Sequence, residues 1–232
     1  MRSLIIGVLC MLLVAVHGMA QDSGILKSQR DKVSYSVGLD IGRTLKMQGV
    51  DVDIEFVTRG LKDAYTGNQA LLTDEEVLEV LSTFKKEFLA KQQELAKQQG
   101  EKNKREGEAF LEANKTKEGV QTLPSGLQYK VVKAGAGKKP AITDTVTVHY
   151  RGTLINGSEF DSSYRRGKPA TFPVNAVVPG WTEALPLMGE GAKWELFIPS
   201  NLAYGERGAG RDIGPNATLM FELELISIEE EK

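Results

Sequence analysis

The spacing of apolar residues changes once along this chain, and the change limits what the chain can fold into. Before about residue 120, apolar residues recur every three or four positions, as they do on one face of a helix. From Leu127 onward they alternate with polar residues, as in half-buried strands. A chain of 232 residues with these two halves predicts an α+β protein, with a helical part followed by an antiparallel sheet.

The first twenty residues have the pattern of a secretory signal peptide. Arg2 precedes an apolar run over residues 4–16 that is short for a membrane span, and Gly18-Met19-Ala20 supplies small residues for cleavage. An uncleaved anchor is the alternative. The single cysteine, Cys10, lies in this run, so the mature protein would contain no disulfide. We therefore expect an exported protein.

The charge of the chain excludes one broad class of function. Its 29 basic and 31 acidic residues give a net charge of −2, which becomes −3 once Arg2 leaves with the signal peptide. Nucleic-acid-binding proteins need a marked basic excess, so we expect no nucleic-acid partner. No later segment is apolar enough to span a membrane, so the mature form should have no span.

The first two predicted helices cover about residues 27–46 and 53–65. Gly38 and Gly42 are four residues apart in the first helix, where a neighbouring helix backbone could approach closely. The apolar stripe of this helix consists of Val33, Val37, Ile41 and Leu45. Gly49 and Gly67 follow the two helices and are suitable C-terminal stops.

A third predicted helix begins at the capping-box sequence Thr73-Asp74-Glu75-Glu76 and runs to about Lys115. Its length of about 40 residues corresponds to about 60 Å. Residues 97–108 are polar on all sides, which indicates a solvated spacer helix or a disordered segment. Of these, we favour the helix, and we expect it to bend or fray at Gly100 and Gly107.

The three helices contain few apolar residues for an independent core. We therefore expect a homodimer through residues 27–90, in which a second copy completes the core. Packing against the C-terminal half of the same chain is the alternative. The expected organisation is a signal peptide at 1–20, a helical dimerisation domain at 21–90, a long polar connecting helix and linker at 91–122, and a sheet domain at 123–229.

The C-terminal half predicts an antiparallel half-barrel wrapped on one short helix. The expected strands lie at about 127–132, 145–152, 193–198 and 218–226, and the short helix at 181–187. Trp181 follows a Pro-Gly turn at the start of this helix, where its indole can form the floor of a pocket. An ordinary core position for Trp181 is the alternative.

Five short motifs in this half occur in the order and spacing of a known family. They are VHYRG at 148–152, GSEFDSS at 157–163, VVPGW at 177–181, LAYG at 202–205 and ATLMF at 217–221. Over about residues 123–229 the chain resembles the FKBP-type peptidyl-prolyl isomerases. The helical part, with YSVG at 35–38 and the long polar helix, is similar to the dimeric subgroup of macrophage infectivity potentiator-like and periplasmic FKBP proteins.

The resemblance implies a cis-trans isomerase of X-Pro bonds that uses no cofactor and no metal. Asp161, Tyr204 and Tyr150 would be catalytic, with Asp161 near the substrate carbonyl and the Tyr204 hydroxyl donating to the substrate. The backbone N–H of Val178 would bind a substrate carbonyl. The substrate-binding residues would be Phe160, Phe172, Val177, Val178, Trp181, Ile213 and Phe221. Taken singly, Tyr150 and Phe160 could be core residues, Asp161 a turn former and Tyr204 a buried anchor.

Two positions depart from the best-known single-domain members. Ala170 and Ala209 stand where those proteins have a phenylalanine and a histidine. We expect the loss of an aromatic at 170 to open one wall of the pocket, which would change sequence preference and could weaken binding of macrolide-type inhibitors.

The resemblance also implies partners and a location. The clients would be unfolded or proline-containing proteins, with the helical dimer acting as an accessory chaperone. The location would be the periplasm or the outer membrane of a Gram-negative bacterium. The alternative function is a peptide-binding holdase with little isomerase activity.

The residues themselves suit a reaction without acids or nucleophiles. Rotation about an X-Pro bond faces a barrier of about 18–20 kcal/mol because resonance makes the C–N bond partly double. An apolar pocket disfavours the polar planar amide relative to the less polar twisted one, and such a difference accelerates rotation. His149 is the only histidine beyond the signal peptide and alternates with Tyr150, so it should face away from the pocket.

Overall fold

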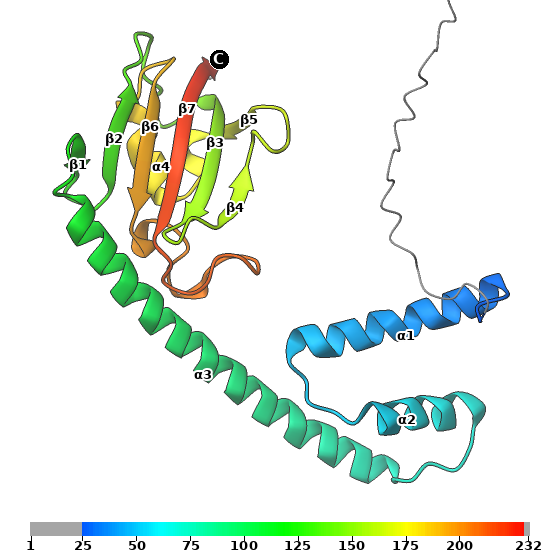
Figure 1. The fold of residues 1–232 in the computed structure, drawn as a ribbon. Coiled ribbons are helices and arrows are strands. Elements are labelled where there is room, and N and C mark those ends of the chain that lie inside the picture. The colour runs from blue at the N-terminus through cyan, green and yellow to red at the C-terminus, as the bar shows by residue number, and fades with distance from the viewer. Residues whose placement is uncertain (1–24, 230–232) are drawn as a thin grey trace, which may run out of the picture. The chain divides into compact units, whose positions relative to one another are not determined.

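The computed structural model describes residues 25–229, so the predicted signal peptide lies outside the described residues. The chain divides into two compact units, one ending at Asp74 and the other beginning at Glu75 (Figure 1). Among residues 25–229, no helix is both long enough and apolar enough to cross a membrane.

The first helix, α1 (Gln29–Gln48), begins and ends at signals that the sequence contains. The hydroxyl of Ser28 accepts a hydrogen bond from a backbone N–H of the first turn, and Gly49 ends the helix with a φ of 67°. The two glycines inside α1 face open space, because a Cβ built at Gly38 or Gly42 would have no atom within 4 Å.

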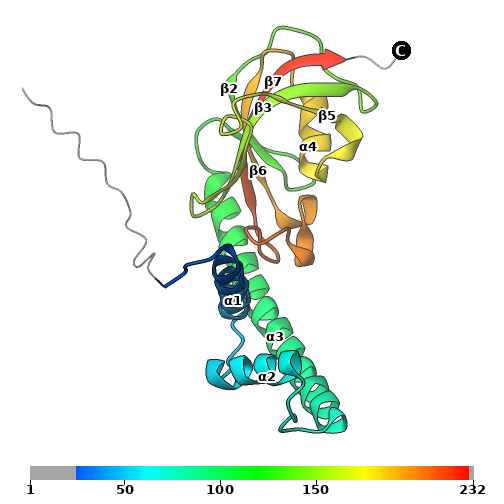
Figure 2. The same ribbon diagram turned by 90° about the vertical axis from the view of Figure 1, so that its right-hand side faces the viewer.

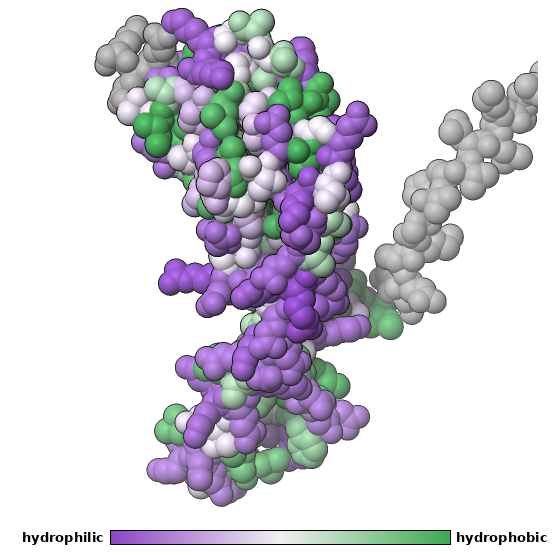
Figure 3. Space-filling model, turned by 90° about the vertical axis from the view of Figure 1, so that its left-hand side faces the viewer, coloured by the Kyte–Doolittle hydropathy of each residue, from purple (hydrophilic) through white to green (hydrophobic). Residues whose placement is uncertain are grey.

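The second helix, α2 (Ile54–Thr66), has Asp53 as its N-cap, and Gly67 follows its last residue, as predicted for this glycine. Neither α1 nor α2 contains a buried residue. Val33 on α1 is 53% exposed and Phe56 on α2 is 68% exposed. Hydrophobic side chains therefore lie open among polar ones on the surface (Figure 3).

The third helix, α3 (Asp74–Asn114), is one continuous helix of 41 residues. It runs through Gly100 and Gly107 without a break, and these two glycines and Asn114 are buried. The expectation that residues 97–108 are solvated on all sides is therefore wrong for one side of the helix. That side packs against the sheet domain, and the two glycines make the close contact possible.

The second unit is built on an open antiparallel sheet in the strand order β1-β2-β6-β7-β3-β4, with β5 also paired to β3. The strands are β1 (Val120–Thr122), β2 (Gln128–Lys133), β3 (Thr145–Leu154), β4 (Glu159–Ser162), β5 (Ala170–Pro173), β6 (Lys193–Ile198) and β7 (Leu219–Glu229). The central β7 pairs with β6 on one side and with β3 on the other. The four expected strands are confirmed, and β1, β4 and β5 are additional.

The short helix α4 (Pro179–Ala184) covers one face of this sheet and continues as a 3-10 turn, Leu185–Leu187 (Figure 2). Proline suits the first turn of a helix, where its missing N–H costs nothing. Gly180 lets the helix approach β6 closely, since a Cβ there would lie 2.5 Å from Ile198.

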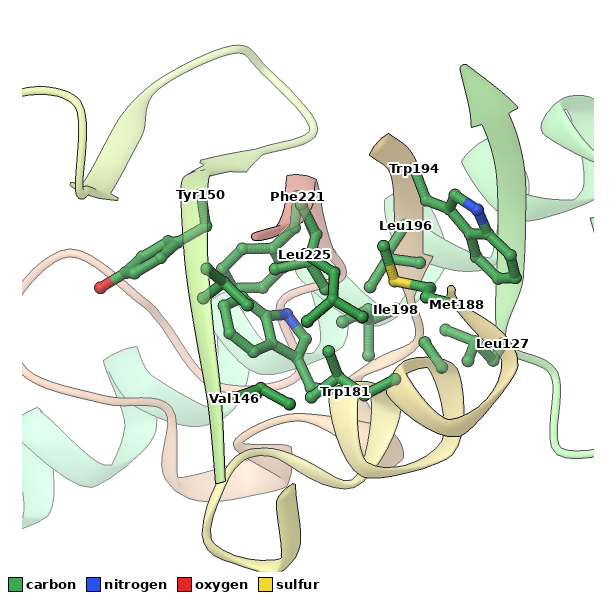
Figure 4. Close-up of a cluster of buried hydrophobic side chains, with 14 of the residues drawn as sticks. Leu127, Val146, Tyr150, Trp181, Met188, Trp194, Leu196, Ile198, Phe221 and Leu225 are labelled. Atoms are coloured by element: carbon green, nitrogen blue, oxygen red, sulfur yellow. The ribbon is translucent and has the colours of Figure 1, made fainter. Parts of the chain in front are cut away.

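The core lies between α4 and the sheet. Strand β3 alternates between this core and the outside, with Val146, Val148 and Tyr150 buried. Figure 4 shows Tyr150, Trp181 and Phe221 together at one side of the cluster. The aromatic residues thus form one end of the core, and that end opens into a pocket.

Candidate functional site

A cavity of about 650 Å³ opens at the aromatic end of the core. All ten residues predicted for the site line this cavity. They are Tyr150, Phe160, Asp161, Phe172, Val177, Val178, Trp181, Tyr204, Ile213 and Phe221. The structure therefore brings together residues that span 72 positions of the sequence, from four strands, one helix and two loops.

Trp181 forms the floor of this cavity. It is 4% exposed, and its ring meets the rings of Tyr150 and Phe221 edge to face at 5.2 and 5.1 Å between centroids. Phe172 makes a third edge contact with the indole at 6.0 Å. Such edge-to-face pairs are favourable beyond the area that they bury. The indole position is thus fixed from three sides, as a rigid pocket floor requires.

Gly152, which was not predicted as a site residue, shapes the wall formed by Phe160 and Phe221. Gly152 on β3 lies across from Asp161 of β4 and Phe221 of β7. A Cβ at this position would lie 2.6 Å from the Phe160 ring and 2.7 Å from the Phe221 ring. The edge-to-face contact of these two rings, 5.5 Å between centroids, therefore depends on glycine at position 152.

Asp161, the acidic residue predicted for the site, is held by two neighbouring side chains. The Tyr150 hydroxyl donates to Asp161 Oδ2 at 2.5 Å, and Arg166 forms an ion pair with Oδ1 of the same carboxylate. Arg166 also donates to the Tyr150 oxygen at 2.6 Å and lies over the Tyr150 ring, 5.3 Å from its centroid. The three side chains form one closed network at the edge of the pocket.

This network sets the protonation of its members. Burial acts to raise the pKa of Asp161, but hydrogen bonds from Tyr150 and Arg166 outweigh it, and the net shift is downward from the ordinary value. Burial raises the pKa of Tyr150, and its hydrogen bond to Asp161 raises it further. At neutral pH the site thus presents a carboxylate, a neutral phenol and a guanidinium.

Arg166 is the member of this network that was not predicted from the sequence. It follows Arg165 in the loop after β4, where neither hydrophobic period nor turn chemistry distinguishes two adjacent arginines. Arg165 instead pairs with Glu159 at 3.1 Å. Only the folded position of this loop decides that Arg166, and not Arg165, contacts Asp161 and Tyr150.

The remaining wall comes from the segment after β6. Tyr204 is 41% exposed, and Ala203, Ala209, Gly210 and Asp212 join it along the cavity. Ala170, the other position that departs from the best-known family members, lies on β5 opposite Val148 and does not line the cavity. Among residues 25–229, no group of three His, Cys, Asp or Glu side chains could hold a metal ion.

His149 faces away from the cavity, as predicted. Its ring stacks on Tyr164 at 4.6 Å between centroids, and Nδ1 lies 2.9 Å from the Ser163 hydroxyl. This hydroxyl also accepts from the backbone N–H of Tyr150 at 2.8 Å. His149 therefore supports β3 from the outer side of the sheet.

Two family models match the chain. Residues 30–131 match the domain amino terminal to FKBP-type peptidyl-prolyl isomerase, and residues 136–226 match the FKBP-type peptidyl-prolyl cis-trans isomerase itself. The chain belongs to the FKBP-type peptidyl-prolyl isomerases. It is an FKBP-type enzyme with the amino-terminal domain that accompanies part of this family.

Several relatives match over both parts of this FKBP chain. The outer membrane protein MIP of Legionella longbeachae is 50% identical over 210 residues, which cover 90% of each protein. The peptidyl-prolyl cis-trans isomerase Mip of Coxiella burnetii is 48% identical over 88% of this chain and 89% of its own length. The crystal structure of FkpA from Escherichia coli matches with a TM-score of 0.67 and 37% identity, covering 88% of this chain and 98% of that one.

Proposed function

We propose that the pocket described above is where this FKBP-type enzyme accelerates X-Pro rotation, in proteins exported from the cell. The observation that supports this most strongly is the aromatic cavity with Asp161 at its edge, held by Tyr150 and Arg166. A proline ring would enter between the aromatic side chains and reach Trp181. The amide carbonyl would then lie near Asp161.

The chemistry requires discrimination between two amide geometries. The planar amide is polar because of resonance, and the twisted transition state has lost that resonance. Apolar walls cannot replace the water that solvates the planar form, so they bind the twisted form relatively better. Each 1.4 kcal/mol of this difference gives about a tenfold acceleration.

The polar groups would orient the substrate rather than exchange protons with it. Tyr204 and Val178 both line the cavity. We expect the Tyr204 hydroxyl and the backbone N–H of Val178 to donate to substrate carbonyls. The pocket should also admit macrolide-type inhibitors. We expect their affinity to be low, because Ala170 and Ala209 remove two of the contacts that the best-known family members supply.

The test is the isomerisation rate of X-Pro peptides with the mature chain, residues 21–232. Asp161→Ala should lower kcat/KM by about 10- to 100-fold, or about 1.4 to 2.8 kcal/mol. Asp212→Ala removes a carboxylate from the same cavity, outside the network, and should change kcat/KM by less than about twofold. Equal losses in the two variants would show that Asp161 has no special role.

We further propose that the chain is a homodimer joined through α1, α2 and the start of α3, and that this dimer helps unfolded clients as well as isomerising them. The exposed apolar residues of α1 and α2 support this, because a face of this kind is unstable in water unless covered. Export to the periplasm or the outer membrane agrees with the name of the Legionella relative, an outer membrane protein.

The alternative is a peptide-binding holdase in which the pocket only docks its ligand. Refolding of a client whose slow step is proline isomerisation separates the two functions. Acceleration at catalytic amounts that Asp161→Ala removes would support the enzyme. Suppression of aggregation without acceleration of refolding would support the holdase.

A further inference from the structure

One stripe of α3 packs against the sheet domain, and it is made of small and polar residues and one phenylalanine. Its members are Gly100, Asn103, Gly107, Phe110 and Asn114, separated by three, four, three and four positions. Each is buried or half-buried, whereas most residues between them are exposed. This spacing keeps all five on one side of the helix.

The C-terminal part of the stripe, Phe110 and Asn114, contacts strands of the sheet. Phe110 meets the ring of Phe197 at 6.0 Å between centroids. The buried amide of Asn114 donates to Gln128 Oε1 at 3.0 Å, and Gln128 donates back to the Leu111 carbonyl at 2.9 Å. These contacts fix the C-terminal turns of α3 on β2 and β6.

The N-terminal part of the stripe, Gly100 and Asn103, contacts the loop between β6 and β7 instead of the sheet. Asn103 Nδ2 donates to the Pro215 carbonyl at 2.7 Å, and Gln99 Nε2 donates to Asn103 Oδ1 at 2.7 Å. A Cβ at Gly100 would lie 3.1 Å from Pro215 Cβ and 3.3 Å from Asn216 Nδ2. Asn216 Nδ2 also donates to the Gly100 carbonyl at 3.5 Å, so the helix backbone contacts the loop directly. Gln99 fixes the orientation of the Asn103 amide.

The same loop forms one wall of the proline pocket. Its base is closed by a hydrogen bond from Asn216 N to the Gly205 carbonyl at 2.8 Å, directly after Tyr204. Within it, Ala209 and Ile213 exchange two backbone hydrogen bonds at 2.8 and 3.1 Å. The cavity is lined from this loop by Ala209, Gly210, Asp212 and Ile213.

We propose that α3 positions this wall, and that Asn103 is a positioning residue for the isomerase. Asn103 does not line the cavity. It holds the Pro215 carbonyl at the base of the loop, next to the bond that fixes Asn216 to Gly205. Because Tyr204 and Ile213 lie on either side of that base, a shift of the base moves both relative to the aromatic floor. Small displacements of substrate-positioning groups reduce rates strongly.

This inference rests on the proposed role of the pocket, and the test separates the two. Asn103→Asp, in the full mature chain, keeps the shape of the side chain and the acceptor for Gln99, but replaces the donor to Pro215 with a carboxylate oxygen. Gln93→Glu makes the same amide-to-acid change on an exposed position of the same helix. Asn103→Ala removes the donor without adding charge.

We expect Asn103→Asp and Asn103→Ala to lower kcat/KM by about threefold to tenfold through a raised KM, at most about 1.4 kcal/mol. The size of the loss should differ among peptides with different residues before proline. Amide hydrogen exchange at Ala209 and Ile213 should become faster by a similar factor, because opening of the loop exposes both N–H groups. Gln93→Glu should match the wild type in every measurement.

A lower thermal midpoint with unchanged kcat/KM and unchanged exchange at Ala209 and Ile213 would overturn the inference, because Asn103 would then be merely structural. An inactive wild type would overturn the proposed function of the pocket. In that case the exchange measurement would still decide whether α3 holds the loop.

Discussion

The sheet domain and the helices α1 and α2 differ in how far their apolar residues are buried. In the sheet domain, large side chains such as Leu127, Leu196 and Leu223 are completely buried. In α1 and α2 no residue is buried, and Val37 and Leu61 remain 55% and 54% exposed. The sheet domain has a hydrophobic core of its own. In contrast, α1 and α2 have apolar side chains that no residue of the described chain buries. A second copy of the chain can bury them.

The glycines of the helices differ in the same way. A Cβ added at Gly100 or Gly107 on α3 would meet other atoms of the chain, whereas one added at Gly38 or Gly42 on α1 would meet none among residues 25–229. All four are costly in a helix, since glycine there loses about 0.5 to 1 kcal/mol relative to alanine. Gly100 and Gly107 have a packing reason within the chain, and the proposed dimer would supply one for Gly38 and Gly42.

The largest expected effect is on the assembly. Val33→Glu with Val37→Glu places two charges on the exposed apolar stripe of α1 and should convert the proposed dimer completely into a monomer. Light scattering measures the mass. Arg43→Glu changes the net charge by the same amount on another side of α1 and should leave the dimer intact. Isomerisation of short peptides should stay within about twofold in both, because the pocket lies in the other unit.

An unchanged dimer mass in the double variant would place the interface elsewhere. A monomer that also loses peptide isomerisation would contradict the independence of the two units.

The next largest effect is on stability, through the packing of α3 against the sheet domain. Gly107→Ala would bring its Cβ into overlap with Thr218 Oγ1, and we expect a loss of about 1 to 3 kcal/mol in the free energy of unfolding. Denaturant unfolding of the sheet domain, followed through its two tryptophans, measures this loss. Thr218→Ser keeps the hydroxyl and should not relieve the clash, whereas Thr218→Ala should restore most of the stability.

A smaller effect tests the other glycine pair. In the monomeric Val33→Glu, Val37→Glu background, Gly38→Ala should stabilise α1 by about 0.5 to 1 kcal/mol, because Gly38 meets nothing in its own chain. In the wild-type background the same change should weaken the dimer. Stabilisation of equal size in both backgrounds would mean that no partner helix lies against Gly38.

The smallest expected effect is that of pH on the pocket. The pKa of Asp161 is lowered, so its carboxylate stays ionised, and the network keeps its stabilising effect, above the ordinary carboxyl pKa of about 3.9. That contribution is lost only as pH falls through the lower folded-state pKa. The pKa of Tyr150 is raised, so its hydroxyl keeps its proton beyond about pH 10.

We therefore expect a flat pH profile of kcat/KM between about pH 5 and pH 9. A rise or fall centred in this range would show that a group outside the Asp161 network controls the reaction.

The sequence predicted most of the fold because its strongest signals are local. Helix α1 ends at Gly49 and α2 starts at Asp53, positions where capping chemistry selects particular residues. Strands β3 and β7 are long enough for their alternation to be clear. The short strands β4 and β5 have four residues each, too few for a period to show.

The pocket could be predicted as a set of residues but not as an arrangement. Family motifs selected Asp161 and Trp181, yet nothing in the motifs indicates that Arg166 closes the network or that Gly152 makes room for two rings. The packed side of α3 escaped prediction for another reason. Hydrophobic periodicity detects apolar contact, and this contact is made by glycine, asparagine and a single phenylalanine.

The seating of α3 has a consequence for the geometry of the whole helix. Because the stripe from Gly100 to Asn114 packs on the sheet domain, the C-terminal part of α3 has a fixed orientation there. Inserting one residue before Gln99 would leave these contacts unchanged, but it would rotate the N-terminal part of the helix by about 100° and move it by about 1.5 Å along the helix axis. The number of residues between Thr73 and Gln99 therefore decides on which side of the helix each residue of this segment lies, relative to the packed stripe.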